Sequence, residues 1–99
     1  MSFRIGYSPD AEGHLRALTA RQRATVLDTV DEQLTHEPDV ETRDRKPMRP
    51  NPVAPWELRI GELRVYYDIT YEPTKMVAVR AVGVKIRNTV SIGGEVIEL

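Results

Sequence analysis

The sequence contains no cysteine, so disulfides, thiolate metal sites and a cysteine nucleophile are excluded. A small domain that is stable without disulfides is typical of a reducing compartment such as the cytoplasm. The chain has two histidines, His14 and His36, and both fall in predicted helices without a metal-binding spacing. A lone histidine in such a place is ordinarily a packed side chain or a helix-end charge. We therefore expect no metal and no cofactor.

Long apolar runs are also absent. No segment approaches the roughly 20 apolar residues that a membrane-spanning helix requires. The first five residues, which include Phe3 and Ile5, read as a strand and lack the apolar stretch of a signal peptide. We expect a soluble, cytoplasmic protein without a membrane partner.

The chain has 99 residues, which is enough for one hydrophobic core and too few for two. Internal repeats and low-complexity tracts are absent. These properties predict a single domain over residues 1–99.

The net charge is only −1, but the charges are unevenly distributed. Residues 1–42 carry four basic and eight acidic side chains, whereas residues 43–87 carry ten basic and five acidic ones. A basic half can present a phosphate-binding face in a nearly neutral protein. A surface that is uneven by chance is the alternative that composition leaves open.

Two helices are predicted near the N-terminus. Ser8 followed by proline is an N-cap signal, and Thr19 with Gln22 forms a capping box that starts a second helix, expected to end near His36. Apolar residues at three- and four-residue steps predict the buried stripe of the second helix: Ala24, Leu27, Val30 and Leu34.

The rest of the chain has the two-residue period of strands. Residues 2–7 predict an edge strand, and residues 39–55 an irregular, proline-rich loop. Residues 56–60 and 63–71 predict a hairpin around Gly61-Glu62, and residues 76–84 a central strand buried on both sides. Residues 90–99 suit a small closing hairpin, although Gly93-Gly94 also permits a flexible tail.

These elements predict an α+β fold in the order strand, helix, helix, strand, strand, strand. The two N-terminal helices pack on one face of a small, mainly antiparallel sheet. The opposite face carries the alternate residues of the hairpin: Glu57, Arg59, Arg64 and Tyr66.

Three segments resemble the RelE/ParE superfamily of toxins. Residues 56–69, Trp-Glu-Leu-Arg-Ile-Gly-Glu-Leu-Arg-Val-Tyr-Tyr-Asp-Ile, look like the central hairpin of these proteins. Residues 79–88 look like their next strand with the basic segment that follows it, and residues 45–48 resemble their basic loop. The resemblance implies the toxin of a type II toxin–antitoxin pair and a cognate antitoxin as partner.

The ribonuclease branch of this superfamily cuts messenger RNA on the ribosome without metal, which implies the ribosome and mRNA as partners. By resemblance, Arg64 matches the arginine that contacts the scissile phosphate, Arg59 matches a lysine position, and Lys85 stands where an arginine is expected. These three are the expected catalytic residues. Arginine suits the role because its planar, permanently charged fork pairs with phosphate oxygens. The expected RNA-binding residues are Arg45, Lys46, Tyr66, as a base-stacking ring, and Arg87.

The sequence departs from this branch at two points. Glu57 reverses the charge of a lysine position, and Ser91 or Ile92 occupies the stretch of the C-terminal tyrosine or histidine that serves as base or acid. One alternative is therefore a ParE-like toxin that poisons DNA gyrase without nuclease activity, and another is a non-toxic antitoxin-binding domain. Arg64 also has a structural alternative, a cross-strand ion pair with Glu57 or Glu62.

Overall fold

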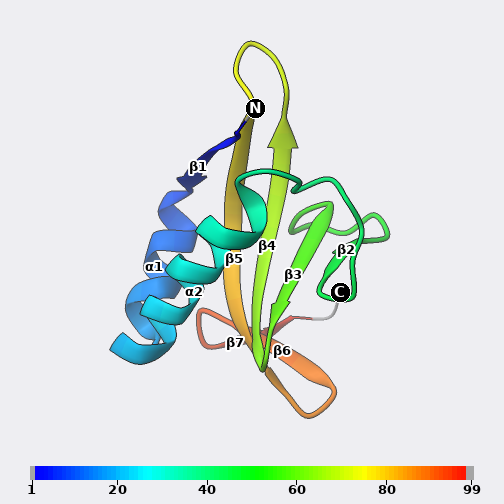
Figure 1. The fold of residues 1–99 in the computed structure, drawn as a ribbon. Helices are drawn as coiled ribbons and strands as arrows, with labels where there is room; N and C mark the ends of the chain where they lie inside the picture. The colour runs from blue at the N-terminus through cyan, green and yellow to red at the C-terminus, as the bar shows by residue number, and fades with distance from the viewer. Residues whose placement is uncertain (1, 98–99) are drawn as a thin grey trace.

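A computed structural model describes residues 2–97, and the predicted continuation of the last strand to Leu99 lies outside them. Within these residues the elements are β1 (Arg4–Tyr7), α1 (Pro9–Ala17), α2 (Ala20–Leu34), β2 (Arg45–Pro47), β3 (Trp56–Ile60), β4 (Leu63–Thr70), β5 (Met76–Ile86), β6 (Thr89–Ile92) and β7 (Glu95–Ile97). Strands β2 to β7 are neighbours in chain order and antiparallel, while β1 pairs in parallel with β5. The helices lie together on one face (Figure 1), so the predicted α+β class is confirmed.

Both helix starts are confirmed. The backbone N–H of Ala11 donates to Ser8 Oγ (3.1 Å), and Thr19 and Gln22 exchange the two hydrogen bonds of a capping box (3.0 and 3.1 Å). Each cap satisfies backbone donors that the first helical turn leaves free.

The predicted buried stripe of α2 is partly wrong. The helix buries Val26, Val30 and Leu34, whereas Ala24 and Leu27 are exposed. Successive helical residues are rotated by about 100°, so a stripe centred on Val26 and Val30 turns Leu27 away from the sheet. The side chain of Arg23 lies at the junction of the helices and donates to the Leu15 and Leu18 carbonyls (3.0 and 3.2 Å).

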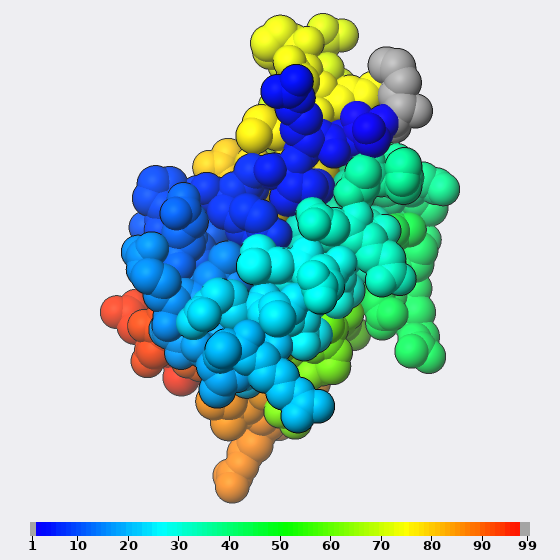
Figure 2. Space-filling model, turned by 60° about the vertical axis from the view of Figure 1, so that its left-hand side comes forward, coloured from blue at the N-terminus to red at the C-terminus, as the bar shows by residue number. Residues whose placement is uncertain are grey.

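The main core lies between the helices and the sheet. Its buried members come from the residue before β1, both helices and the three central strands: Phe3, Ala11, Leu15, Val26, Val30, Leu34, Leu58, Leu63, Val65, Tyr67, Val77, Val79 and Val82. Trp56 stacks on Tyr67 with ring centroids 6.0 Å apart. Figure 2 shows α1 and α2 side by side on the surface of the molecule. The longer, α2, ends at Leu34, and no helix within residues 2–97 is long and apolar enough to span a membrane.

A bulge in β5 changes which residues face the core. Tyr66 pairs with Ala81 and Tyr67 with Val79, so Arg80 is the extra residue. Before the bulge Val79 faces the helices, and after it Val82 does, because one inserted residue reverses the alternation of a strand. Ala81 consequently joins the other face of the sheet.

Helix α1 covers the edge of β5 beside this bulge. On that edge β1 pairs with residues 76–79 and β6 with residues 83–86, which leaves an interval between them. The N–H of Val82 donates to His14 Nδ1 (3.2 Å), and Ser8 binds the Val79 carbonyl through its N–H (2.9 Å) and the Arg80 carbonyl through its hydroxyl (3.1 Å). His14 thus has a packing role, as the sequence predicts.

A second, smaller core lies on the opposite face. In it, Ala54 of the loop of residues 48–55 and Ile92 of the β6–β7 hairpin pack on Tyr66 and Ala81. The loop is ordered around Asn51, whose amide donates to the Arg49 and Ala54 carbonyls and whose Oδ1 accepts from two backbone N–H groups. The predicted irregular stretch 39–55 was wrong for Arg45–Pro47, which pair with β3 as β2. Three residues with a proline are too few to display a strand period.

The β6–β7 hairpin folds closely over Gly83. A Cβ at this position would lie 2.7 Å from the Ser91 carbonyl oxygen, 2.8 Å from Ile92 Cγ1 and 2.9 Å from Val90 Cγ1. Glycine is therefore the residue that lets β6 cover the second core.

We predict that Gly83→Ala lowers the free energy of unfolding by about 1–3 kcal/mol, because β6 backbone must move to make room. Gly13→Ala in α1 is the matched control: its Cβ would meet only Arg16 Nη2 at 3.9 Å, and alanine in a helix adds about 0.4–1 kcal/mol. Urea unfolding of both variants measures the difference. Equal stability of the two would contradict the close packing of β6.

Candidate functional site

A groove of about 660 Å³ opens on the second face of the sheet. Its floor is formed by Glu57 and Arg59 of β3. Residues 46–49, at the end of β2, line one wall, and residues 88–90 with Ile97, from the β5–β6 turn and the last hairpin, line the other. Among the residues that the structure describes, the groove collects three cationic side chains, Lys46, Arg49 and Arg59, around one carboxylate.

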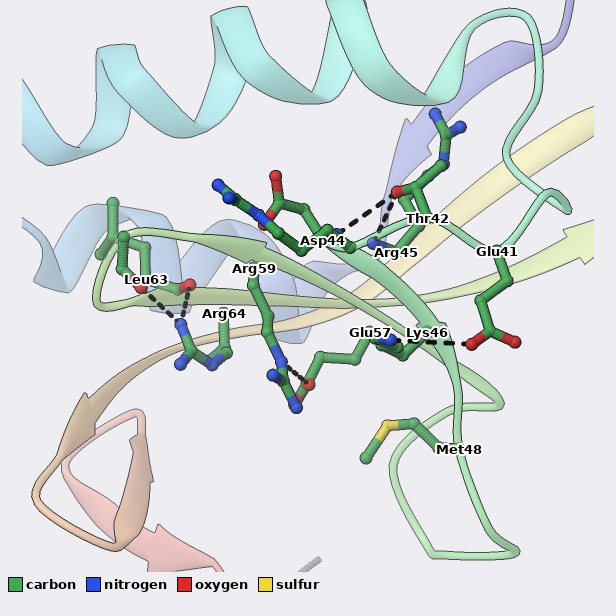
Figure 3. A network of polar contacts seen from close by, with 12 residues as sticks. Glu41, Thr42, Asp44, Arg45, Lys46, Met48, Glu57, Arg59, Leu63 and Arg64 are labelled. Carbon is green, nitrogen blue, oxygen red and sulfur yellow. Dashed lines mark hydrogen bonds and ion pairs between the residues drawn. The ribbon is translucent and has the colours of Figure 1, made fainter.

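The carboxylate and the central arginine of the groove form an ion pair. Arg59 Nε donates to Glu57 Oε1 at 2.9 Å; the arginine side chain is 50% exposed and that of the glutamate only 11%. The two residues are two apart on one strand, so their side chains leave the same face and meet (Figure 3). The more exposed guanidinium therefore lies above a nearly buried carboxylate.

Arg64 is directly opposite Arg59 in the β3–β4 register, but it is buried, with 7% of the residue exposed. Its Nη1 donates to the carbonyls of Gly61 (2.7 Å) and Leu63 (2.8 Å), so the guanidinium folds back on the β3–β4 turn (Figure 3). Within residues 2–97 it has no ion pair with Glu57 or Glu62. The predicted phosphate-contacting arginine thus stabilises the turn beside the groove, while Arg59 presents its charge to the solvent.

Tyr66 does not lie on the surface, as a base-stacking ring would. Its exposed fraction is 0%, because the β6–β7 hairpin and residues 48–54 cover it. Its hydroxyl is buried and has no hydrogen-bond partner among residues 2–97. Burial raises the pKa of this hydroxyl, and the Glu57 carboxylate across the β3–β4 pair raises it further.

Arg45 and Lys46 point to opposite sides of β2. Arg45 donates from Nη1 to the Gln33 carbonyl (2.6 Å) and from Nε to the Val40 carbonyl (3.0 Å), which ties β2 to the end of α2. Lys46 lies in the groove wall, 3.6 Å from Glu41. Of these two predicted RNA-binding residues, Lys46 therefore lines the groove and Arg45 does not.

Lys85 and Arg87 are exposed beyond the groove, at the end of β5 and in the β5–β6 turn. Lys85 pairs with Val90 of the groove wall, and Arg87 has a positive φ of 60° in the tight turn. Figure 2 shows this turn projecting as the orange tip of the molecule. Their charges extend the basic surface outward from the groove.

Sequence reasoning did not assign Arg49 and Asn88 to the site, although both line the groove. Arg49 belongs to a charge run typical of a solvated loop, and only the Asn51 hydrogen bonds fix that loop against the sheet. From the sequence, Glu57 was expected on this face but was not assigned to the site, and it forms part of the floor of the groove. Among residues 2–97 no three His, Asp or Glu side chains are grouped as for a metal ion.

We predict that Arg45→Ala lowers the free energy of unfolding by about 1–3 kcal/mol, because two backbone carbonyls lose a charged donor. Lys46→Ala is the matched control, and since an exposed ion pair adds little we expect a change below about 0.5 kcal/mol. Thermal unfolding of the two variants tests this. A Tm that falls equally in both would contradict the opposite placement of the two side chains.

Comparison with known proteins identifies the fold. No protein-family model matches the chain, and no curated protein is a significant match. The crystal structure of the RelBE2 toxin–antitoxin complex from Mycobacterium tuberculosis contains a similar chain, with a TM-score of 0.73 and 26% sequence identity over 86% of this chain and 100% of that one. This agrees with the resemblance of the hairpin residues. The shared fold and the hairpin residues together support a RelE-like toxin of a type II toxin–antitoxin system.

Proposed function

We propose that this toxin inhibits translation by binding messenger RNA on the ribosome through the groove and cleaving it. The observation that carries the proposal is the convergence of Lys46, Arg49 and Arg59 on one groove from two separate segments of the chain. Such a cluster favours a polyanion, because each cation that neutralises a phosphate also releases counterions. Lys85 and Arg87 would contact phosphates of the same RNA strand beyond the groove.

The groove holds the groups that metal-independent cleavage requires. Glu57, the one carboxylate that lines it among residues 2–97, accepts the proton of the ribose 2′-hydroxyl; the O2′–P bond forms and the P–O5′ bond breaks. Arg59 stabilises the charge on the phosphoryl oxygens, and the Lys46 ammonium gives a proton to the departing O5′. The products are a 2′,3′-cyclic phosphate and a 5′-hydroxyl. Arg64 supports this site by holding the β3–β4 turn and by its buried positive charge.

An antitoxin is the proposed partner in the resting cell. The similar solved structure is a toxin–antitoxin complex, which supports a cognate antitoxin for this chain as well. An antitoxin segment with acidic side chains over the groove would neutralise the three cations that RNA requires. The cytoplasm is the compartment that this function implies.

The gyrase-poisoning alternative is favoured by one observation. Ile92 is buried in the second core and Ser91 is half-buried in β6, so the stretch where the nuclease branch has a tyrosine or histidine offers no such ring to the groove. A toxin without nuclease activity would then use the same surface to bind protein. A domain that binds only its antitoxin is the remaining alternative.

We predict that Arg59→Ala abolishes growth arrest and weakens binding of single-stranded RNA without unfolding the protein. Losing one phosphate contact should reduce the slope of log affinity against log salt by about 0.7. The matched control is Arg21→Ala, which removes the same charge from an exposed position in the first turn of α2.

The measurement is induced expression in bacteria without antitoxin, with growth, transcript ends and gyrase-linked DNA breaks recorded together. Ribosome-dependent transcript ends that vanish in Arg59→Ala establish the nuclease. DNA breaks without transcript cleavage move the chain to the gyrase-poisoning branch, and unimpaired growth with wild-type protein leaves an antitoxin-binding domain.

A further inference from the structure

The Glu57 carboxylate is a neighbour of two donor groups, the Arg59 guanidinium and the Tyr66 hydroxyl. Glu57 and Tyr66 are directly opposite in the β3–β4 register, on the face that carries the groove. Glu57 binds Arg59 at 2.9 Å, while the buried hydroxyl of Tyr66 lacks a partner among the described residues. One carboxylate therefore lies between two donors. It has a direct hydrogen bond with Arg59, while the Tyr66 hydroxyl lies near enough for Glu57 to raise its pKa as an acceptor but does not reach hydrogen-bond geometry.

The two donors differ in their access to a ligand. Arg59 is half exposed, so a phosphate in the groove can reach its guanidinium. Tyr66 is 0% exposed, so solvent and ligand are both kept from its hydroxyl. A buried hydroxyl without a partner is unfavourable, and a carboxylate is a strong acceptor for it. Glu57 is the acceptor that the cross-strand register offers.

We propose that phosphate binding exchanges the partners of Glu57: Arg59 leaves the carboxylate for the phosphate, and the Tyr66 hydroxyl donates to the carboxylate in its place. The inference rests on the proposed function, because the phosphate is that of the bound RNA. Tyr66 is then a positioning residue, which holds Glu57 after Arg59 has left. In the absence of phosphate the Glu57 carboxylate takes the place of the ligand on Arg59.

The exchange predicts opposite behaviour for two adjacent tyrosines. Tyr66→Phe should leave the free energy of unfolding unchanged or raise it, yet weaken binding of a single-stranded DNA oligonucleotide, a probe without 2′-hydroxyls, about tenfold. Tyr67→Phe is the matched control: its hydroxyl donates to the Pro38 carbonyl (2.7 Å) on the helix side, so this variant should lose stability and keep the affinity.

A double-mutant cycle tests the role of the carboxylate. Glu57→Gln should bind the DNA oligonucleotide more tightly, because Arg59 no longer has a competing anion. Adding Tyr66→Phe to Glu57→Gln should then weaken binding by less than Tyr66→Phe does alone. Effects that simply add would overturn the exchange.

A nitrogen NMR signal tests the partner exchange independently of the proposed RNA-cleaving function. The Arg59 Nε–H resonance of the whole chain is followed as inorganic phosphate is added, in wild type and in Tyr66→Phe. A shift that needs more phosphate in the variant supports the exchange even if RNA proves not to be the substrate.

Two further results would overturn the exchange. Equal phosphate and oligonucleotide affinities of wild type and Tyr66→Phe, with binding still lost in Arg59→Ala, would reject the exchange and keep the RNA-binding function. Loss of stability in Tyr66→Phe equal to that in Tyr67→Phe would mean that the hydroxyl already has a partner.

Discussion

The bulge at Arg80 is the constraint on which the two faces of the sheet depend. β5 is the longest strand, with 11 residues, and it pairs with three others. Without the inserted residue, the alternation that places Val77 and Val79 under the helices would place Ala81 there and turn Val82 to the opposite face. The bulge instead puts a small residue, Ala81, beside Tyr66 and keeps Val82 in the main core. The interval it leaves on the edge of β5 is covered by Ser8, the N-cap of the first helix, and by His14 within that helix.

The groove follows from that arrangement. Gly83, two residues beyond Ala81, has no side chain on the second face, so β6 can fold across it and place Ile92 on Tyr66. The same fold brings residues 88–90 opposite the end of β2, and this closes the groove over Glu57 and Arg59. The groove has cations on its floor and on one wall. Its shape thus depends on small, uncharged residues of β5, Ala81 and Gly83.

The fold could be predicted from the sequence where local signals were strong. The capping residues Ser8 and Thr19, the glycine turn at Gly61 and the strand alternation of residues 56–69 each depend on neighbours in sequence. What could not be predicted depends on tertiary packing: the bulge, the short strand β2, and the rotation of α2 toward Val26. The site residues divide in the same way. Alternation put Arg59, Arg64 and Tyr66 on one face, but only the packed hairpin and turn determine that Tyr66 and Arg64 are buried.

The burial of Arg64 changes what the charges of this face can do. A guanidinium that donates to two turn carbonyls is held in place, and its charge acts on the groove from beside it rather than by contact. Two arginines directly opposite each other repel unless an anion lies nearby. In the unliganded protein Glu57 is that anion for Arg59, which explains a glutamate in a position surrounded by cations. A phosphate carries the same sign of charge and presents it from the solvent side, so it can replace the carboxylate on Arg59. The reversed charge at Glu57 is in this view compatible with a phosphate-binding groove.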